Sequence, residues 1–146
     1  MHPAASRALF ERDVATLSPE LARRRQWVLH SLTYPLIDCS FAAERRTTLR
    51  VRFRCDDWND LPPSVTLHAA DGSLLIAPLR NASNVFHSSR HPATNEFFVC
   101  MRGTREYHTY SSHVTDLWEN IKRSSCSYSL GGILTQIWHA WERGKD

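Results

Sequence analysis

The stretch TLRVRFRC, residues 48–55, alternates strictly between polar and apolar side chains. Successive side chains of a β-strand point to opposite faces of a sheet, so this pattern predicts a strand that is buried on one face only. The side chains predicted to face the core are Leu49, Val51, Phe53 and Cys55. One buried and one solvated face are typical of an antiparallel sheet.

The segments on either side of this strand also have β character. Residues 28–41 (VLHSLTYPLIDCSF) are apolar and β-prone, and Pro35 within them predicts a break or an edge position. After the strand, Leu61-Pro62-Pro63 leads into a third predicted strand at residues 64–68. We therefore expect an antiparallel meander of about four strands.

After the third predicted strand, Asp71-Gly72 predicts a tight turn before Leu74-Leu75-Ile76. Residues 78–92 are polar and predict an irregular segment. Residues 103–122 carry aromatic side chains and histidines without a clear period, which predicts a long functional loop with a helical turn near Asp116.

Helices are predicted at both ends of the chain. Residues 6–28 have a helical pattern, and Ser18-Pro19-Glu20 predicts a kink or a second helix start within it. The clearest helix follows Ser129, a good N-cap, and places an apolar stripe from Leu130 to Trp141 on one side. This order predicts an α+β fold in a single domain spanning residues 1–146.

Composition excludes several classes of function. The net charge of +3 is mild and the basic residues are dispersed, so we expect neither nucleic acid nor a membrane as partner. The chain has no apolar run of about 18 residues and no signal-peptide layout, which predicts a cytoplasmic location. The four cysteines form no C-x-x-C pair, so we expect reduced thiols and no bound metal. No glycine-rich phosphate loop is present, and we expect no cofactor.

The stretch HPATNEFFVC, residues 91–100, raises the question of function. It ends an apolar run in Cys100, directly before Met101-Arg102-Gly103. A free cysteine is usually buried and inert. At the end of a strand, however, the thiol can be exposed as a nucleophile.

The order of these landmarks resembles the ubiquitin-conjugating enzyme family, in particular its bacterial relatives. The matching features are Pro62-Pro63, His91-Pro92, Cys100, Trp118 and the helix from Tyr128 to Trp141, in that order along the chain. The resemblance covers residues 6–142. It implies the fold of that family, with a first helix, a four-strand meander, a long active-site loop and a second helix, and without the family's C-terminal helices.

The resemblance also implies an activity. Cys100 would accept a ubiquitin-like modifier protein from an activating-enzyme-like protein as a thioester, and would pass it to an amine of a protein target. His91 belongs to the matching motif. The family's asparagine after His-Pro is Ala93 here, so Asn95 is the candidate to replace it, and His108 is the candidate to orient the loop or to transfer a proton.

Two further sets of residues are assigned roles. Positive charge from Arg102, Arg105 and His108 is expected to favour the thiolate of Cys100. The positions implied for partner binding are Arg23, Arg24, Pro62 and Pro63.

Two alternatives stay open at this point. One is a zinc protein that uses His87, His91, Cys100, His108 and His113, since His-x3-His and His-x4-His are ligand spacings. The other is a non-catalytic adaptor of the same fold, in which Cys100 would resist alkylation.

Overall fold

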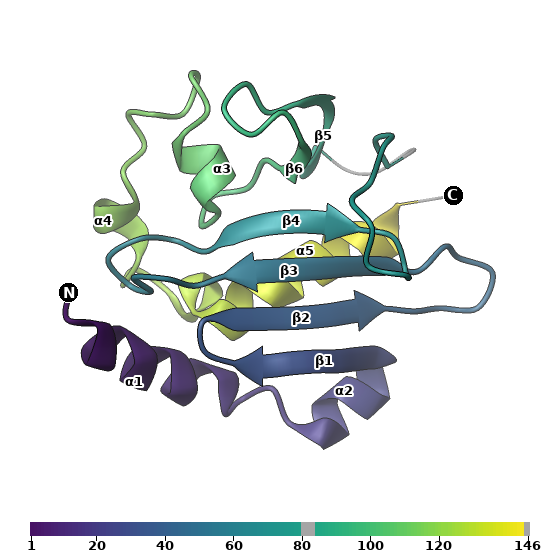
Figure 1. Cartoon of the computed structure of the whole chain (residues 1–146), viewed down its shortest axis with the longest axis horizontal. Helices are drawn as coiled ribbons and strands as arrows, with labels where there is room; N and C mark the ends of the chain where they lie inside the picture. Colours follow the sequence, from purple (N-terminus) through teal and green to yellow (C-terminus); the bar gives the residue numbers. More distant parts are fainter. Residues whose placement is uncertain (80–83, 145–146) are drawn as a thin grey trace.

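The computed structural model describes residues 1–79 and 84–144, with a four-stranded antiparallel sheet that has a long helix on one face (Figure 1). In chain order the elements are α1 (Pro3–Val14), α2 (Pro19–Arg25), β1 (Trp27–Thr33), β2 (Leu36–Phe41), β3 (Leu49–Arg54), β4 (Ser64–His68), β5 (Phe86–Arg90), β6 (Phe97–Val99), α3 (Arg105–His108), α4 (Trp118–Ile121), the 3-10 helix η1 (Cys126–Tyr128) and α5 (Leu130–Arg143). The predicted α+β class is confirmed. Within the described residues, no helix combines the length and the apolar character needed to cross a bilayer.

Strands β1 to β4 form the predicted meander, and each strand pairs with its neighbour in the chain. Val51 in β3 pairs with Cys39 of β2 on one side and with Leu67 of β4 on the other. All three side chains are buried. The register therefore gathers the apolar sets of the strands on one face, where Cys55 also lies fully buried as predicted.

The N-terminal helical pattern forms two helices rather than one continuous helix. Helix α2 starts where Ser18 accepts a hydrogen bond from the backbone N–H of Leu21, with Pro19 in its first turn, so the predicted second start is confirmed. The helix ends at Arg25 because Gln26 adopts a left-handed conformation (φ 57°). The prediction that helix continues to Val28 was wrong, since Val28 already belongs to β1.

The turns of the sheet follow the predicted breaks. Pro35 follows a cis peptide bond in the turn between β1 and β2. Gly72 has a φ of 92°, which suits a residue without a side chain, and its N–H donates to the carbonyl of Ala69. Leu74 makes only an isolated bridge to His68, so residues 74–76 do not form a strand.

The prediction that residues 78–92 are irregular was wrong in part, because residues 86–90 form a strand. Residues 80–83 lie outside the described part of the chain, but strand β5 follows and pairs with β6 as an antiparallel hairpin. The polar side chains of Ser88, Ser89 and Arg90 are exposed, so the segment lacks the apolar pattern of a buried strand.

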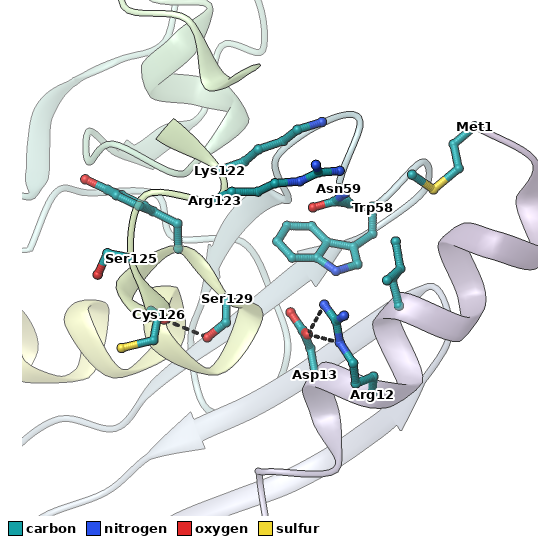
Figure 2. Close-up of a pocket in the computed structure, with 12 residues that line it drawn as sticks. Met1, Arg12, Asp13, Trp58, Asn59, Lys122, Arg123, Ser125, Cys126 and Ser129 are labelled. Atoms are coloured by element: carbon teal, nitrogen blue, oxygen red, sulfur yellow. Dashed lines mark hydrogen bonds and ion pairs between the residues drawn. The ribbon is translucent and has the colours of Figure 1, made fainter. Parts of the chain in front are cut away.

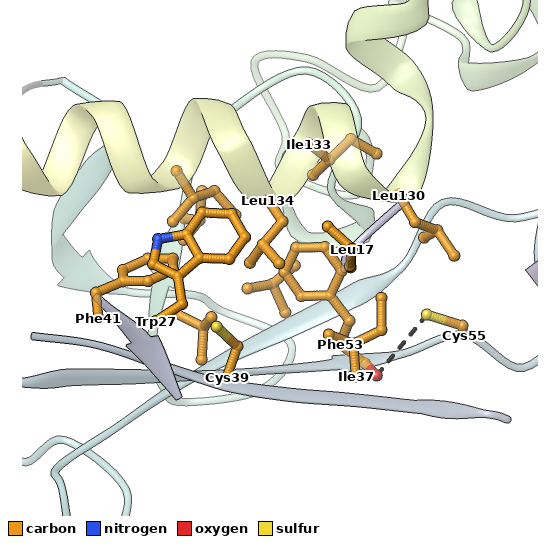
Figure 3. Packing of buried hydrophobic residues seen from close by; sticks show 14 of the residues in the cluster. Leu17, Trp27, Ile37, Cys39, Phe41, Phe53, Cys55, Leu130, Ile133 and Leu134 are labelled. Atoms are coloured by element: carbon orange, nitrogen blue, oxygen red, sulfur yellow. Dashed lines mark hydrogen bonds between the residues drawn. The ribbon is translucent and has the colours of Figure 1, made fainter. Parts of the chain in front are cut away.

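Helix α5 covers one face of the sheet and completes the core (Figure 1). Ser129 caps its first turn by accepting a hydrogen bond from Gly132, as predicted. Figure 3 shows Leu130 and Leu134 of this helix directed toward Phe53 and the other apolar side chains of the sheet. Burying a leucine of this kind contributes about 1.5–3 kcal/mol to stability.

A buried carboxylate joins α5 to the start of the chain. Asp13 of α1 accepts a hydrogen bond from the backbone N–H of Leu130 (3.1 Å), and its side chain is almost fully buried. A negative charge at a helix N-terminus is favourable because the backbone N–H groups there lack partners within the helix.

The opposite face of the sheet carries a charged cluster centred on Asp38 of β2. Arg50 binds both carboxylate oxygens of Asp38 (2.8 Å each), and Arg52 binds one of them (3.0 Å). Burial alone would raise the pKa of Asp38, but the hydrogen bonds from both arginines outweigh it and hold the pKa below its usual value. This cluster therefore stabilises the fold only while Asp38 is ionised.

Asp38→Asn should lower the free energy of unfolding by about 2 kcal/mol near neutral pH, because it removes charge-assisted hydrogen bonds from a buried site. A lowered pKa gives stability that is present above the unfolded-state pKa of about 4 and is lost as pH falls through the folded-state value. Urea unfolding of both proteins should show the difference shrinking between about pH 6 and about pH 3.

Asp56→Asn is the matched control, since Asp56 pairs with Arg54 on the exposed surface. Its effect should stay under about 1 kcal/mol. A loss in Asp38→Asn that is the same at both pH values would contradict the role given to its charge.

Candidate functional site

Cys100 lies directly after β6 and is partly exposed, unlike the two cysteines of the core. Its backbone N–H donates to the carbonyl of Val85 (2.7 Å), which ties the end of β6 to the residue before β5. Cys39 and Cys55 are fully buried, and Cys126 is exposed as the first residue of η1. Among the four thiols, Cys100 alone combines access with a position at the end of a strand.

The expected activation of Cys100 by positive charge was wrong. Burial raises the pKa of the Cys100 thiol instead of lowering it. Arg102 is committed to Asp116 through two hydrogen bonds (2.8 and 3.0 Å). Arg105 points to the connection between β3 and β4, where it donates to the carbonyls of Pro62 and Asp56. Neither guanidinium is available to the thiol in this arrangement.

His91 is buried and serves as a joint between two segments. Its Nδ1 accepts a hydrogen bond from the N–H of Ala93 (3.0 Å), so Nε2 carries the proton and donates to the carbonyl of Glu106 (3.1 Å). The ring also packs edge-on against Phe98 (4.9 Å between ring centres). The His-Pro motif thus fixes the hairpin before Cys100 against the loop after it.

Asn95 forms the turn between β5 and β6. It has a φ of 58°, a left-handed conformation that asparagine tolerates better than most residues. Its N–H donates to the carbonyl of His91, and its carbonyl accepts from Arg90. These contacts involve its backbone, so a role for its side chain stays a prediction.

His108 has both ring nitrogens bonded to backbone groups. Nδ1 donates to the carbonyl of Asp116 (2.6 Å), and Nε2 accepts from the N–H of Gly103 (3.1 Å). Burial lowers the pKa of His108, partly offset by the bond to the Asp116 carbonyl. The ring therefore acts as a neutral clamp that closes the loop from Gly103 to Asp116.

Asp116 is the centre of this loop, and the sequence did not reveal it as a site residue. Besides Arg102, its carboxylate accepts a hydrogen bond from the Tyr107 hydroxyl (2.8 Å). These bonds, that of Arg102 first, hold the pKa of Asp116 below its usual value. Burial and the bond to Asp116 raise the pKa of Tyr107 to about 12. Tyr107 in turn stacks on His113 (4.1 Å).

Glu106 fastens the same loop to the edge of the sheet. Its buried carboxylate accepts from the Ser64 hydroxyl and from the Val65 N–H of β4, both at 2.7 Å. Burial raises the pKa of Glu106, and these two hydrogen bonds oppose the shift. Thr104, which caps α3 by accepting from Tyr107, is the sequence signal that could have placed a helix here.

The predicted partner-binding positions separate into two groups. Arg23 and Arg24 are exposed on α2, where a partner can reach them. Pro62 and Pro63 are buried, and their carbonyls accept hydrogen bonds from Arg105. This corrects the expectation for the two prolines, which hold α3 in place and offer no binding surface.

The side chains considered as zinc ligands do not gather into a ligand set. His87 stacks on Phe98 (4.7 Å), while His108 and His113 are engaged within the loop. In residues 1–79 and 84–144, no three His, Cys, Asp or Glu side chains are placed to hold a metal ion together. The structure therefore gives the zinc alternative no support.

Comparison with known proteins adds one similarity. Residues 80–143 match the family described as Y4jH-like, the Y4jH family. The matched part holds the β5–β6 hairpin, Cys100, the loop and α5, and it leaves out the four-stranded sheet. No curated protein matches the chain.

The two hydrogen bonds of His108 change the effect on stability that is expected when its side chain is removed. From the sequence, His108→Ala is expected to leave the melting temperature nearly unchanged. With both ring nitrogens engaged, it should instead lower the free energy of unfolding by about 1–3 kcal/mol. Hydrogen exchange should become faster at the Gly103 amide, which loses its acceptor. The control is His139→Ala on the exposed side of α5, and an unchanged Gly103 amide in His108→Ala would contradict the clamp.

Proposed function

We propose that the chain carries a ubiquitin-like modifier protein as a thioester on Cys100 and passes it to an amine of a protein target. The observation that carries this proposal is the partial exposure of Cys100 at the end of β6, while Cys39 and Cys55 are buried. A carrier thiol must be reachable by two partners in turn. The resemblance of the landmarks to ubiquitin-conjugating enzymes supports the same activity and fold.

The chemistry consists of two acyl transfers. In the first, the Cys100 thiolate attacks the thioester carbonyl that joins the modifier to its activating enzyme, a new C–S bond forms, and the enzyme's thiolate leaves. In the second, an amine of the target attacks the carbonyl, an amide forms, the amine loses a proton, and the Cys100 thiolate leaves. Neither step requires a metal or an oxidant.

In this proposal the surrounding residues position the thiol and do not activate it. His91 and Glu106 fix the hairpin and the loop on either side of Cys100. His108 belongs to the same support, because its two nitrogens are bonded to backbone groups. Because burial raises the pKa of the Cys100 thiol, we assign the lowering of that pKa during the reaction to a bound partner.

Docking of the activating-enzyme-like protein is assigned to Arg23 and Arg24. Both lie exposed at the C-terminal end of α2 beside Arg25, which is held by Trp27 and Trp138 through cation–π contacts. Charges at the rim of an interface mainly speed association.

A non-catalytic adaptor of the same fold is the second candidate. The observation in its favour is the partial burial of Cys100, which raises the pKa of its thiol and leaves little thiolate near neutral pH. The two candidates differ in whether Cys100 accepts an acyl group.

Incubation with the small-thiol thioester of a peptide that ends in glycine should add the peptide to Cys100. The product should gain mass in a mass spectrum and lose it again on treatment with a reducing thiol. Cys100→Ala should abolish the adduct, because it removes the acceptor sulfur.

Cys126→Ala is the matched control, since Cys126 is more exposed than Cys100. It should leave the adduct intact, whereas a reaction governed by exposure alone would favour Cys126. An adduct that persists in Cys100→Ala would contradict the assignment of Cys100 as the carrier thiol. The absence of an adduct at Cys100 in the parent protein would favour the adaptor.

The raised pKa of Cys100 predicts how its alkylation depends on pH. Since only the thiolate reacts, the rate with iodoacetamide should rise about tenfold per pH unit and should still be rising above about pH 8.5, the ordinary thiol pKa. The rate is measured by mass spectrometry of the peptide that contains Cys100. A plateau below about pH 8 would mean that a nearby positive charge lowers the pKa after all.

A further inference from the structure

A pocket of about 490 Å³ lies away from β6, between α1, the turn that holds Trp58 and the segment from Lys122 to Ser129. Figure 2 shows the Trp58 ring between Lys122 and Arg123 on one side and Arg12 and Asp13 on the other. A volume of this size is in the range of small-molecule sites.

The side chains around this pocket have an excess of positive charge. Arg12, Lys122 and Arg123 line it, and Asp13 is the carboxylate that lines it, so three charges against one leave an excess of two. Glu119 pairs with Lys122 but is itself exposed and does not line the pocket. A phosphate monoester has a charge of about −1.5 to −2 at neutral pH, which matches this excess better than a single carboxylate does.

Trp58, which lines this pocket, carries a hydrogen-bond donor without an acceptor. The indole Nε1 of Trp58 is buried, and no partner for it exists among the described residues. The neighbouring Trp118, which packs against Trp58, has its own indole nitrogen bonded to the carbonyl of Asn59 (3.0 Å). Leaving a buried donor unpaired is costly, so an oxygen that accepts from Trp58 would restore the lost interaction.

Arg12 is the side chain that can open the way to this donor. Figure 2 shows the indole nitrogen on the side of Arg12 and Asp13. The Arg12 side chain is 70% exposed, and its contacts with Asp13 are long, at 3.3 and 3.4 Å. Asp13 keeps its bond to the Leu130 N–H if Arg12 turns to a ligand.

From these features we propose that the pocket binds the phosphate group of a small phosphomonoester, with Trp58 Nε1, Arg12, Lys122 and Arg123 as its donors. The site is independent of Cys100 and of the carrier activity. Hydrogen bonds from charged donors and a desolvated indole suit an oxyanion with several acceptor oxygens.

The test is a titration with inorganic phosphate at constant ionic strength, followed by NMR of the tryptophan indole N–H signals. The Trp58 signal should move and saturate, with a dissociation constant on the order of 1 mM for phosphate alone. The Trp118 signal is the internal control for a paired indole, and the Trp27 signal for an unpaired one outside the pocket. Adenosine monophosphate should move the Trp58 signal, and adenosine should not.

Variants separate the site from general charge effects. Arg123→Gln should weaken phosphate binding about tenfold, since it removes a charged donor that has no ion-pair partner in the described part of the chain. Arg143→Gln at the end of α5 is the matched control, since Arg143 is exposed and does not line the pocket, and it should leave binding unchanged. Three outcomes would each overturn the proposal: a Trp58 signal that does not move, equal movement of the Trp27 signal, and acetate that binds as tightly as phosphate.

Discussion

The burial of the apolar side of α5 against the four-stranded sheet is the constraint that positions the segments between them. The helix and the sheet are far apart in the chain, so their contact fixes the path of all residues between β4 and α5. Within that path, Gly103 lies so close to Ile133 of α5 that an added Cβ would be 3.2 Å from it. The loop after Cys100 therefore has little freedom once α5 is seated.

Much of the fold is legible in the sequence because burial and periodicity act locally. The alternation from Leu49 to Cys55 identified β3 and its buried face, and the apolar stripe after Ser129 identified α5. Pro35 marked the turn between β1 and β2 because proline is excluded from the interior of a sheet. In each case one segment contains the whole signal.

The parts that could not be predicted depend on pairs of residues from different segments. Strand β5 has exposed polar side chains and is stabilised by pairing with β6, so its own sequence does not mark it. The charge of Arg102 is visible in the sequence, but its effect on Cys100 is set by Asp116, which lies at the other end of the loop. Glu106 reads as an ordinary surface residue until β4 is placed beside it. The position of Cys100 could thus be predicted, while its electrostatic surroundings could not.

For the proposed carrier activity, the engagement of both nitrogens of His108 has a consequence for the lifetime of an acyl group on Cys100. Hydrolysis of a thioester is faster when a nearby base removes a proton from water. His108 cannot take that proton without first releasing the Gly103 N–H, and Asp116 is occupied by Arg102 and Tyr107. A loop stabilised in this way would keep a stored acyl group from being lost to water, and would leave its release to the partner that brings the acceptor.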